Sequence, residues 1–90
     1  MPEYLLDGER MTNQKKLHKY MRKALELPVF YKDDLNSLYE CLTTYVKKDT
    51  KIILINREYM QNSLEAYGKT LVDVFKKADA NNEKLTFKCD

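Results

Sequence analysis

The sequence predicts a compact α/β fold, in which three parallel strands are joined by helical crossovers and about four helices pack on the sheet. Two observations indicate this class. Short apolar runs of strand character alternate with longer stretches of helical periodicity, in the order strand-helix-helix-strand-helix-helix-strand. The chain has 90 residues, too few to divide its apolar side chains between two cores, so we expect one domain over residues 1–90.

The N-terminal half contains one predicted strand and two predicted helices. Residues 4–6 end at a turn signal and form a short strand. Apolar residues at i, i+3, i+4, i+7 and i+8 predict a helix over 13–26, which Pro28 ends. Asp33 and Asp34 can cap a second helix. Its apolar residues share one stripe: Leu35, Leu38, Leu42, Tyr45 and Val46.

The C-terminal half contains two strands and two more helices. The near-continuous apolar run at 51–55 is typical of a strand that is covered on both faces or lies at a sheet centre. Asn56 is expected to cap a short helix through about residue 64. A longer stripe over 64–78 predicts a helix that ends at Asn81-Asn82 in a left-handed cap. Alternating apolar residues predict the last strand, at 85–89.

Composition and charge argue against several classes of protein. Sixteen basic and 14 acidic residues leave a net charge of +2, which by itself does not call for nucleic acid or membrane as a partner. The longest apolar run, at 52–55, is too short to span a bilayer, and no signal peptide is visible. We therefore expect a cytoplasmic protein in which Cys41 and Cys89 are reduced thiols.

Patterns that would indicate catalysis or a cofactor are missing from the sequence. It contains no Gly-rich phosphate loop, nucleophile elbow or paired acid/base set. The single histidine, His18, makes no recognisable zinc spacing with the two cysteines, and we expect it to have a structural role. The sequence thus predicts a protein that is not an enzyme and that uses no metal and no cofactor.

The second predicted helix has an outer face with unusual chemistry. Opposite its apolar stripe, a helical wheel places Asn36, Tyr39, Glu40, Thr43 and Thr44. No Lys or Arg occurs from residue 33 to residue 46. An outward tyrosine beside a carboxylate is typical of a recognition surface, and a loop carrying two further aromatic residues precedes the helix. This face suits an electropositive cleft; the alternative is a merely solvated helix face.

Leu27-Pro28-Val29-Phe30-Tyr31, followed by LNSLYECLT at 35–43, resembles the inhibitory loop and second helix of the barstar family. The resemblance extends over essentially the whole chain. It implies the same three-stranded fold and stoichiometric inhibition of a secreted-type ribonuclease, encoded nearby, whose active site is plugged by the loop at 29–34 and the helix at about 34–46. Glu40 would mimic a substrate phosphate. The expected contact residues are Phe30, Tyr31, Asp34, Asn36, Tyr39, Glu40, Thr43, Thr44, Tyr45 and Lys77.

The sequence also departs from the barstar pattern, and its surface is less negative as a result. Acidic positions of the family are replaced by Asn36, Lys77 and Asn81, and Glu40 replaces an aspartate. Tyrosines at 39 and 45 stand where tryptophans are usual, and Lys32 and Thr44 replace glycines. We therefore expect the partner to be a different ribonuclease from the family's own, which should bind weakly at best.

Two alternative functions remain. The fold could serve as an interaction module that regulates a partner other than a ribonuclease. The basic first helix could also make the chain a weak RNA-binding protein, through Lys15, Lys16, Lys19, Arg22 and Lys23. That helix has no Gly-rich clamp and no ring of exposed aromatics, so the sequence favours a solvated face over nucleic acid; a steep salt dependence of RNA binding would favour the opposite.

Overall fold

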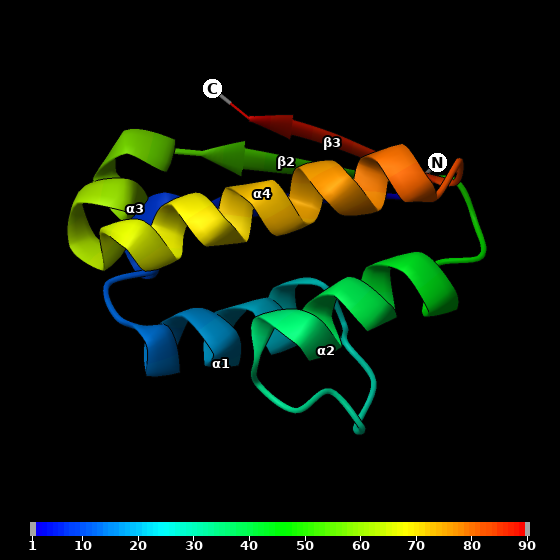
Figure 1. Ribbon diagram of the computed structural model, residues 1–90, viewed down its shortest axis with the longest axis horizontal. Helices are drawn as coiled ribbons and strands as arrows, with labels where there is room; N and C mark the ends of the chain where they lie inside the picture. The colour runs from blue at the N-terminus through cyan, green and yellow to red at the C-terminus, as the bar shows by residue number, and fades with distance from the viewer. Residues whose placement is uncertain (1, 90) are drawn as a thin grey trace.

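The elements occur in the predicted order in the computed structural model, which describes residues 2–89 (Figure 1). They are β1 (Glu3–Asp7), the 3-10 turn η1 (Gly8–Arg10), α1 (Gln14–Ala24), α2 (Leu35–Glu40), the π-helical segment η2 (Cys41–Tyr45), β2 (Thr50–Ile55), α3 (Arg57–Leu64), α4 (Ala66–Asn81) and β3 (Leu85–Cys89). The predicted α/β class, with a three-stranded sheet and four α-helices, is confirmed.

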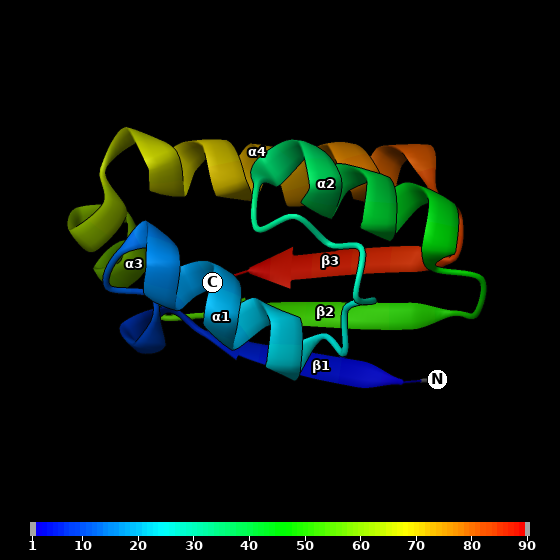
Figure 2. The ribbon, with the colours of Figure 1, turned by 90° about the horizontal axis from the view of Figure 1, so that it is seen from below.

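The sheet is parallel throughout and has the order β1-β2-β3, with β2 at its centre. Figure 2 shows that α1, α2 and α4 lie together on one face. Along β2, Ile52 and Leu54 are buried under these helices, whereas Ile53 and Ile55 on the other face are half-buried. Of the two explanations for the apolar run at 51–55, the central position is the correct one.

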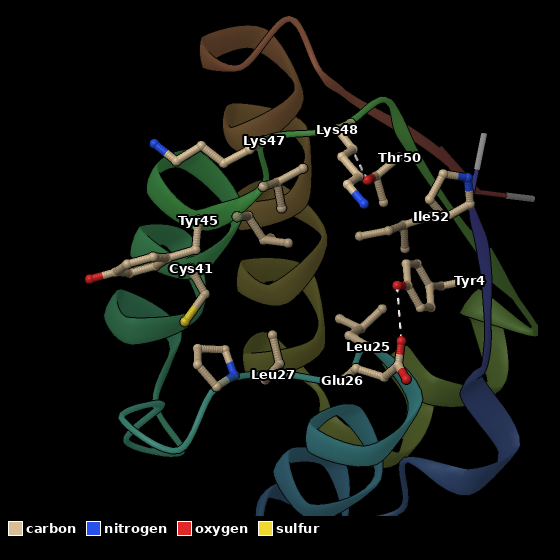
Figure 3. A pocket seen from close by; sticks show the side chains of 14 residues that line it. Tyr4, Leu25, Glu26, Leu27, Cys41, Tyr45, Lys47, Lys48, Thr50 and Ile52 are labelled. Atoms are coloured by element: carbon tan, nitrogen blue, oxygen red, sulfur yellow. Dashed lines mark hydrogen bonds between the residues drawn. The ribbon is translucent and has the colours of Figure 1, made fainter.

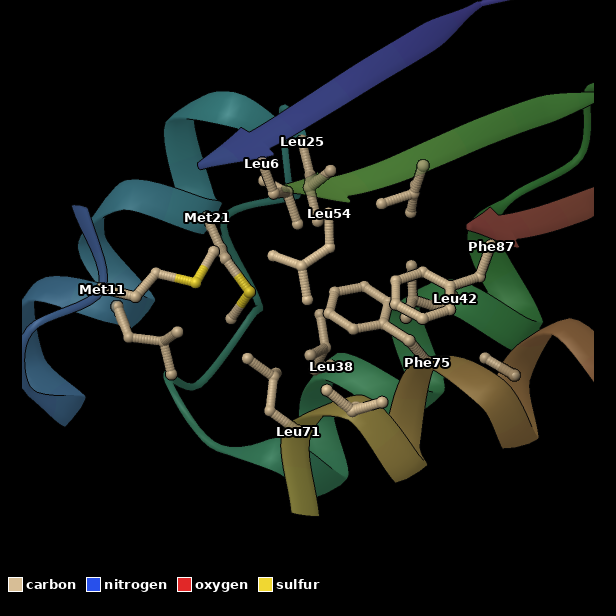
Figure 4. Close-up of a cluster of buried hydrophobic side chains, with 14 of the residues drawn as sticks. Leu6, Met11, Met21, Leu25, Leu38, Leu42, Leu54, Leu71, Phe75 and Phe87 are labelled. Carbon is tan, nitrogen blue, oxygen red and sulfur yellow. The ribbon is translucent and has the colours of Figure 1, made fainter. Parts of the chain in front are cut away.

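The core fills the space between the sheet and the three helices (Figure 4). Leu6 and Leu54 are paired across β1 and β2 and are fully buried. Phe75 of α4 stacks on Phe87 of β3 with ring centroids 4.8 Å apart. Burial of a large apolar side chain contributes about 1.5–3 kcal/mol, so these contacts hold α4 against the sheet.

Side-chain caps define where the first two helices begin. Asn13 accepts a hydrogen bond from the backbone N–H of Lys16, at 2.9 Å, and Asp34 accepts one from that of Ser37, at 2.6 Å. Each satisfies a donor that has no partner within its helix. The predicted cap at Asp34 is confirmed. Asp33 does not cap α2: its backbone is left-handed, with φ of 57°, and its carboxylate pairs with Arg22.

Asn56 stands at the N-cap position of α3, as expected, whereas the left-handed cap predicted at Asn81-Asn82 is wrong; the side chains of Asn56 and Asn82 both bond to distant segments. Asn56 makes no capping bond to α3, and its amide donates to the Asp7 carboxylate at 2.8 Å. Asn82 has an extended backbone, with φ of −137°, rather than a left-handed one. Its amide donates to the carbonyl oxygens of Leu42, at 2.8 Å, and Val46, at 3.2 Å, which ties the end of α4 to η2.

Candidate functional site

The loop at 28–34, α2 and η2 form a continuous edge of the molecule. We call five of its exposed residues the recognition edge: Phe30, Asn36, Glu40, Thr44 and Tyr45; Val29, Lys32, Asp33 and Asp34 of the loop are exposed beside them. The residues Asn36, Glu40 and Thr44 follow one another at intervals of four and form its central row. Tyr39 and Thr43 are half-buried beside this row, and Asp34 and Lys77 are exposed at its borders. Most of the expected contact residues are therefore accessible together.

The π-helical segment η2 changes which residues point outward at the end of the edge. A π-helix has more residues per turn than an α-helix, so side chains after Glu40 are rotated relative to an ideal wheel. Leu42 remains buried, but Tyr45 is 52% exposed. The prediction that Tyr45 belongs to the apolar core stripe is therefore wrong. Its ring instead lies against that of Phe30, with centroids 4.6 Å apart, and the two form an exposed aromatic pair.

Tyr31 was expected to contact a partner, but its side chain is only 2% exposed and this expectation is wrong. The loop turns the ring inward, where its hydroxyl bonds to Nδ1 of His18. Arg22 covers it from the other side: its guanidinium carbon lies 5.2 Å from the ring centroid, and Nη2 donates to the Tyr31 carbonyl at 2.9 Å. Tyr31 therefore anchors the loop and leaves Phe30 as its exposed aromatic residue.

His18 is buried at the centre of a polar network beneath the loop. Nε2 lies 2.6 Å from the Tyr67 hydroxyl, and Nδ1 bonds to that of Tyr31. A neutral imidazole has one N–H donor and one acceptor, so one tyrosine accepts a hydrogen bond and the other donates one. Burial lowers the pKa of His18, partly opposed by Asp33 and Asp34. The network joins α1, the loop and α4, in agreement with the structural role expected of His18.

Further bonds hold the loop against α1 and α2. The backbone N–H of Lys32 donates to the Ser37 hydroxyl at 3.0 Å. Arg22 and Asp33 form an ion pair of 2.7 Å. These contacts fix both sides of the turn that presents Phe30. The loop is therefore ordered before any partner arrives, which lowers the entropy that binding would cost.

Tyr39 is held in place by α4, a contact that sequence reasoning missed. The side-chain amide of Asn81 donates to the Tyr39 hydroxyl at 2.9 Å and to the Lys77 carbonyl at 3.0 Å. This arrangement orients the phenol beside Glu40 and brings Lys77 to the border of the recognition edge. The i, i+4 spacing of Lys77 and Asn81 places both on one face of α4, but nothing local in the sequence points to Tyr39 as their neighbour.

Glu40 is exposed and makes no ion pair with any described residue. Within residues 2–89 the ion pairs are Arg22–Asp33, Lys51–Glu3 and Lys84–Asp49. Lys77 is therefore not bonded to Glu40, although both border the same helix pair. A carboxylate in this state can accept hydrogen bonds from an external cation without first giving up an internal partner.

A cavity of about 340 Å³ has Tyr45 among its lining residues (Figure 3). Its walls come from the α1–α2 connection, η2 and the first residues of β1 and β2, and they include Leu25, Leu27, Val46 and Ile52. At its rim the Tyr4 hydroxyl donates to Glu26 at 3.2 Å. No sequence pattern indicates this cavity, because its walls come from segments that are distant along the chain.

Within the described part of the chain, three or more His, Cys, Asp or Glu side chains nowhere gather in a way that could hold a metal ion. Cys41 is buried on the apolar side of the helix and Cys89 is half-buried, and neither is in a disulfide. Burial raises the pKa of the Cys41 thiol. No helix among residues 2–89 is long and apolar enough to cross a membrane.

Comparison with known proteins agrees with this architecture. The family model described as "Barstar (barnase inhibitor)" matches residues 1–90. "Putative ribonuclease inhibitor YrdF" of Bacillus subtilis (strain 168) is 28% identical over 78 residues, which cover 87% of this chain and 86% of that protein. Because the family model matches the full length, and the sheet and helices are those that the resemblance implied, the chain belongs to the Barstar family of non-enzymatic ribonuclease inhibitors.

Proposed function

We propose that this protein inhibits a ribonuclease by inserting its recognition edge into the enzyme's active site. The loop at 29–34 and the helix at about 34–46 would form the plug, and Glu40 would take the place of a substrate phosphate. The observation that carries the proposal is the exposed Glu40 carboxylate, which forms no ion pair with any of residues 2–89, on the edge that also carries the Phe30–Tyr45 pair.

The chemistry of a ribonuclease site explains why a carboxylate can block it. The enzyme must hold a phosphodiester, so it presents Arg, Lys or His donors in a concave pocket. Glu40 can accept charge-assisted hydrogen bonds from two such donors at once. Glu40 projects from a short helix, and the loop before that helix is held by its own hydrogen bonds. Binding would therefore cost little backbone conformational entropy.

The aromatic residues would seal the contact around this charge. Tyr39, held by Asn81, stands beside Glu40 and excludes water from its hydrogen bonds. The Phe30–Tyr45 pair offers apolar area at one end of the edge, where it could stack on groups at the rim of the enzyme. Aromatic residues are enriched among the hot spots of protein–protein interfaces, where the surrounding contacts exclude water.

The charge of the edge favours a partner different from the family's own. Asn36 and Lys77 stand at positions that are acidic in the family pattern, so the partner's rim must tolerate Lys77. We infer a secreted-type ribonuclease, encoded nearby and met by this protein in the cytoplasm. An alternative, favoured by the same two residues, is that the edge regulates a protein that is not a ribonuclease.

The decisive test is capture of the partner. Immobilised wild-type protein and its Glu40→Ala variant would be exposed to extract of the source cell, washed, and treated with denaturant to release bound ribonuclease. Glu58→Ala, an exposed acid on α3, is the matched control. We expect ribonuclease activity from the wild type and the control, and much less from Glu40→Ala.

The captured enzyme, or the ribonuclease encoded beside this protein, would then be titrated with the pure inhibitor. Complete inhibition at one equivalent supports the proposal. If the enzyme keeps its activity at excess inhibitor, or if Glu40→Ala inhibits as well as the wild type, the phosphate-mimic mechanism is wrong.

A further inference from the structure

The flank of α1 that faces away from the recognition edge carries a second surface of distinct chemistry. It is a shallow depression of about 370 Å³, which we call the basic groove, lined by Glu9, Arg10, Thr12, Lys16, Lys19, Tyr20 and Lys23. Of the five basic residues of the first helix noted in the sequence, Lys16, Lys19 and Lys23 line the groove, whereas Lys15 and Arg22 do not; folding adds Arg10, from the turn η1. The guanidinium carbon of Arg10 lies 5.9 Å from the centroid of the Tyr20 ring.

The positive charges of the basic groove are not neutralised within the described chain. Among residues 2–89, none of Arg10, Lys16, Lys19 and Lys23 takes part in an ion pair, since the three ion pairs lie elsewhere. The groove lining holds four cations and the single carboxylate of Glu9, and the nearby Asp7 carboxylate also interacts with Arg10, so two of the four positive charges remain in excess. The net charge of the whole chain is only +2, so the positive charge of the protein is concentrated at this groove.

The cations follow the axis of α1. Lys16, Lys19 and Lys23 are spaced i, i+3 and i+7, so at 1.5 Å per residue the row is about 10 Å long. His18 and Arg22, on the other flank of the helix, contact Tyr31 of the recognition-edge loop. The basic groove and the recognition-edge loop therefore lie against different flanks of α1.

We propose that the basic groove binds the phosphodiester backbone of single-stranded RNA. A linear row of unpaired cations suits a linear row of phosphates. Glu9 and Thr12 add hydrogen-bonding oxygens that can bond the ribose 2′-hydroxyl, which DNA lacks. With no exposed aromatic platform in the basic groove, the affinity is electrostatic and tolerant of base sequence.

The same surface is poorly suited to a lipid membrane. Helices that bind bilayers pair a basic face with apolar side chains that enter the interface. The exposed large hydrophobic residues of the described chain all lie outside α1 and η1; they are Leu5, Val29, Phe30, Tyr45 and Tyr59. The basic groove offers charge without an apolar anchor, which favours a hydrated polyanion.

The test is fluorescence anisotropy of the full chain with a labelled 12-nucleotide poly(U) RNA at several salt concentrations. The variant Lys16→Gln/Lys19→Gln/Lys23→Gln is compared with Lys69→Gln/Lys76→Gln/Lys88→Gln, which removes the same charge from exposed positions elsewhere. We expect the groove variant to bind at least ~10-fold more weakly at 50 mM salt, and its salt slope to fall by about 2. The control should change less than about two-fold.

Three results would overturn the proposal. Equal losses in both triple variants would mean that only net charge matters. Equal affinity for DNA of the same length, unaffected by Glu9→Ala, would remove the selectivity for RNA. Tighter binding to vesicles rich in anionic lipid than to RNA would make the surface a membrane contact. The assay contains no ribonuclease, so its failure would leave the proposed inhibition untouched, and thermal melts would verify that each variant is folded.

Discussion

The rings of Phe30 and Tyr45 lie 4.6 Å apart at an angle of 56°, although one belongs to the loop before α2 and the other to the π-helical segment after it. Both are about half exposed, at 49% and 52%. Each ring shields part of the other from water and leaves one face for a partner. We therefore expect the two rings to contact a partner as one apolar surface.

Phe30→Ala should weaken ribonuclease binding by about 1–2 kcal/mol, because aromatic anchors with large contact area are frequent hot spots. The variant should keep the wild-type thermal midpoint, since the ring lies outside the core. Titration calorimetry with the captured enzyme measures the loss. Tyr59→Ala, which removes an equally exposed aromatic residue from α3, serves as control. If both variants lose the same binding free energy, the Phe30–Tyr45 pair has no specific role in binding.

Glu40→Ala should cost at least ~2 kcal/mol of binding free energy while leaving the fold intact, because a charged residue at the contact centre leaves the enzyme's cations unpaired when it is removed. The complex of barstar with barnase is a well-known example of such a loss of binding free energy, so the expected magnitude is taken from this family. Calorimetry beside the Glu58→Ala control gives the value for this protein. Unchanged affinity would exclude Glu40 from the role of phosphate mimic.

Tyr39→Ala should also lower the affinity, whereas Lys16→Ala should not, because Lys16 lies on the opposite flank of α1. Asn81→Ala should have a smaller effect of the same sign: the phenol remains but loses the bond that orients it. Inhibition titrations of the three variants against one enzyme preparation provide the comparison. The reverse order, with Lys16→Ala the most damaging, would indicate that the basic helix is the site that matters.

Stability should decrease as the pH falls below about 6.5, the ordinary pKa of histidine. His18 is bonded to two tyrosines in its neutral form, and burial lowers its pKa, so the unfolded chain takes up a proton before the folded chain does. The contribution is complete above 6.5 and is lost progressively below it, by at most about 1.4 kcal/mol per pH unit.

Urea unfolding at pH 7.5 and pH 5.5 measures this effect. His18→Gln keeps one donor and one acceptor at the same site but cannot be protonated, so its loss of stability between the two pH values should be smaller than that of the wild type. Parallel losses in both proteins would assign the pH dependence to carboxylates elsewhere.

Local sequence patterns were enough to predict the order of the elements and the class of the fold. Apolar periodicity distinguishes strands from helices, and helices between strands require a parallel sheet. The core side of the helices also followed from this periodicity, except at Tyr45. The same patterns identified Asn36, Glu40 and Thr44 as outward residues, because all lie far from the apolar stripe on any helical wheel. For these positions no knowledge of neighbouring segments is needed.

Which aromatic side chains of the recognition edge face outward is decided only by the tertiary structure. Tyr31 turns inward because His18 and Arg22 of another helix hold it, and Tyr45 turns outward because η2 is wound as a π-helix. Tyr39 is oriented by Asn81, far along the chain. A helical wheel assumes ideal α-helical winding and contains no information about neighbouring segments. The orientation of each of these tyrosines depends instead on local winding, or on a hydrogen bond or ring contact with a segment that is distant in sequence.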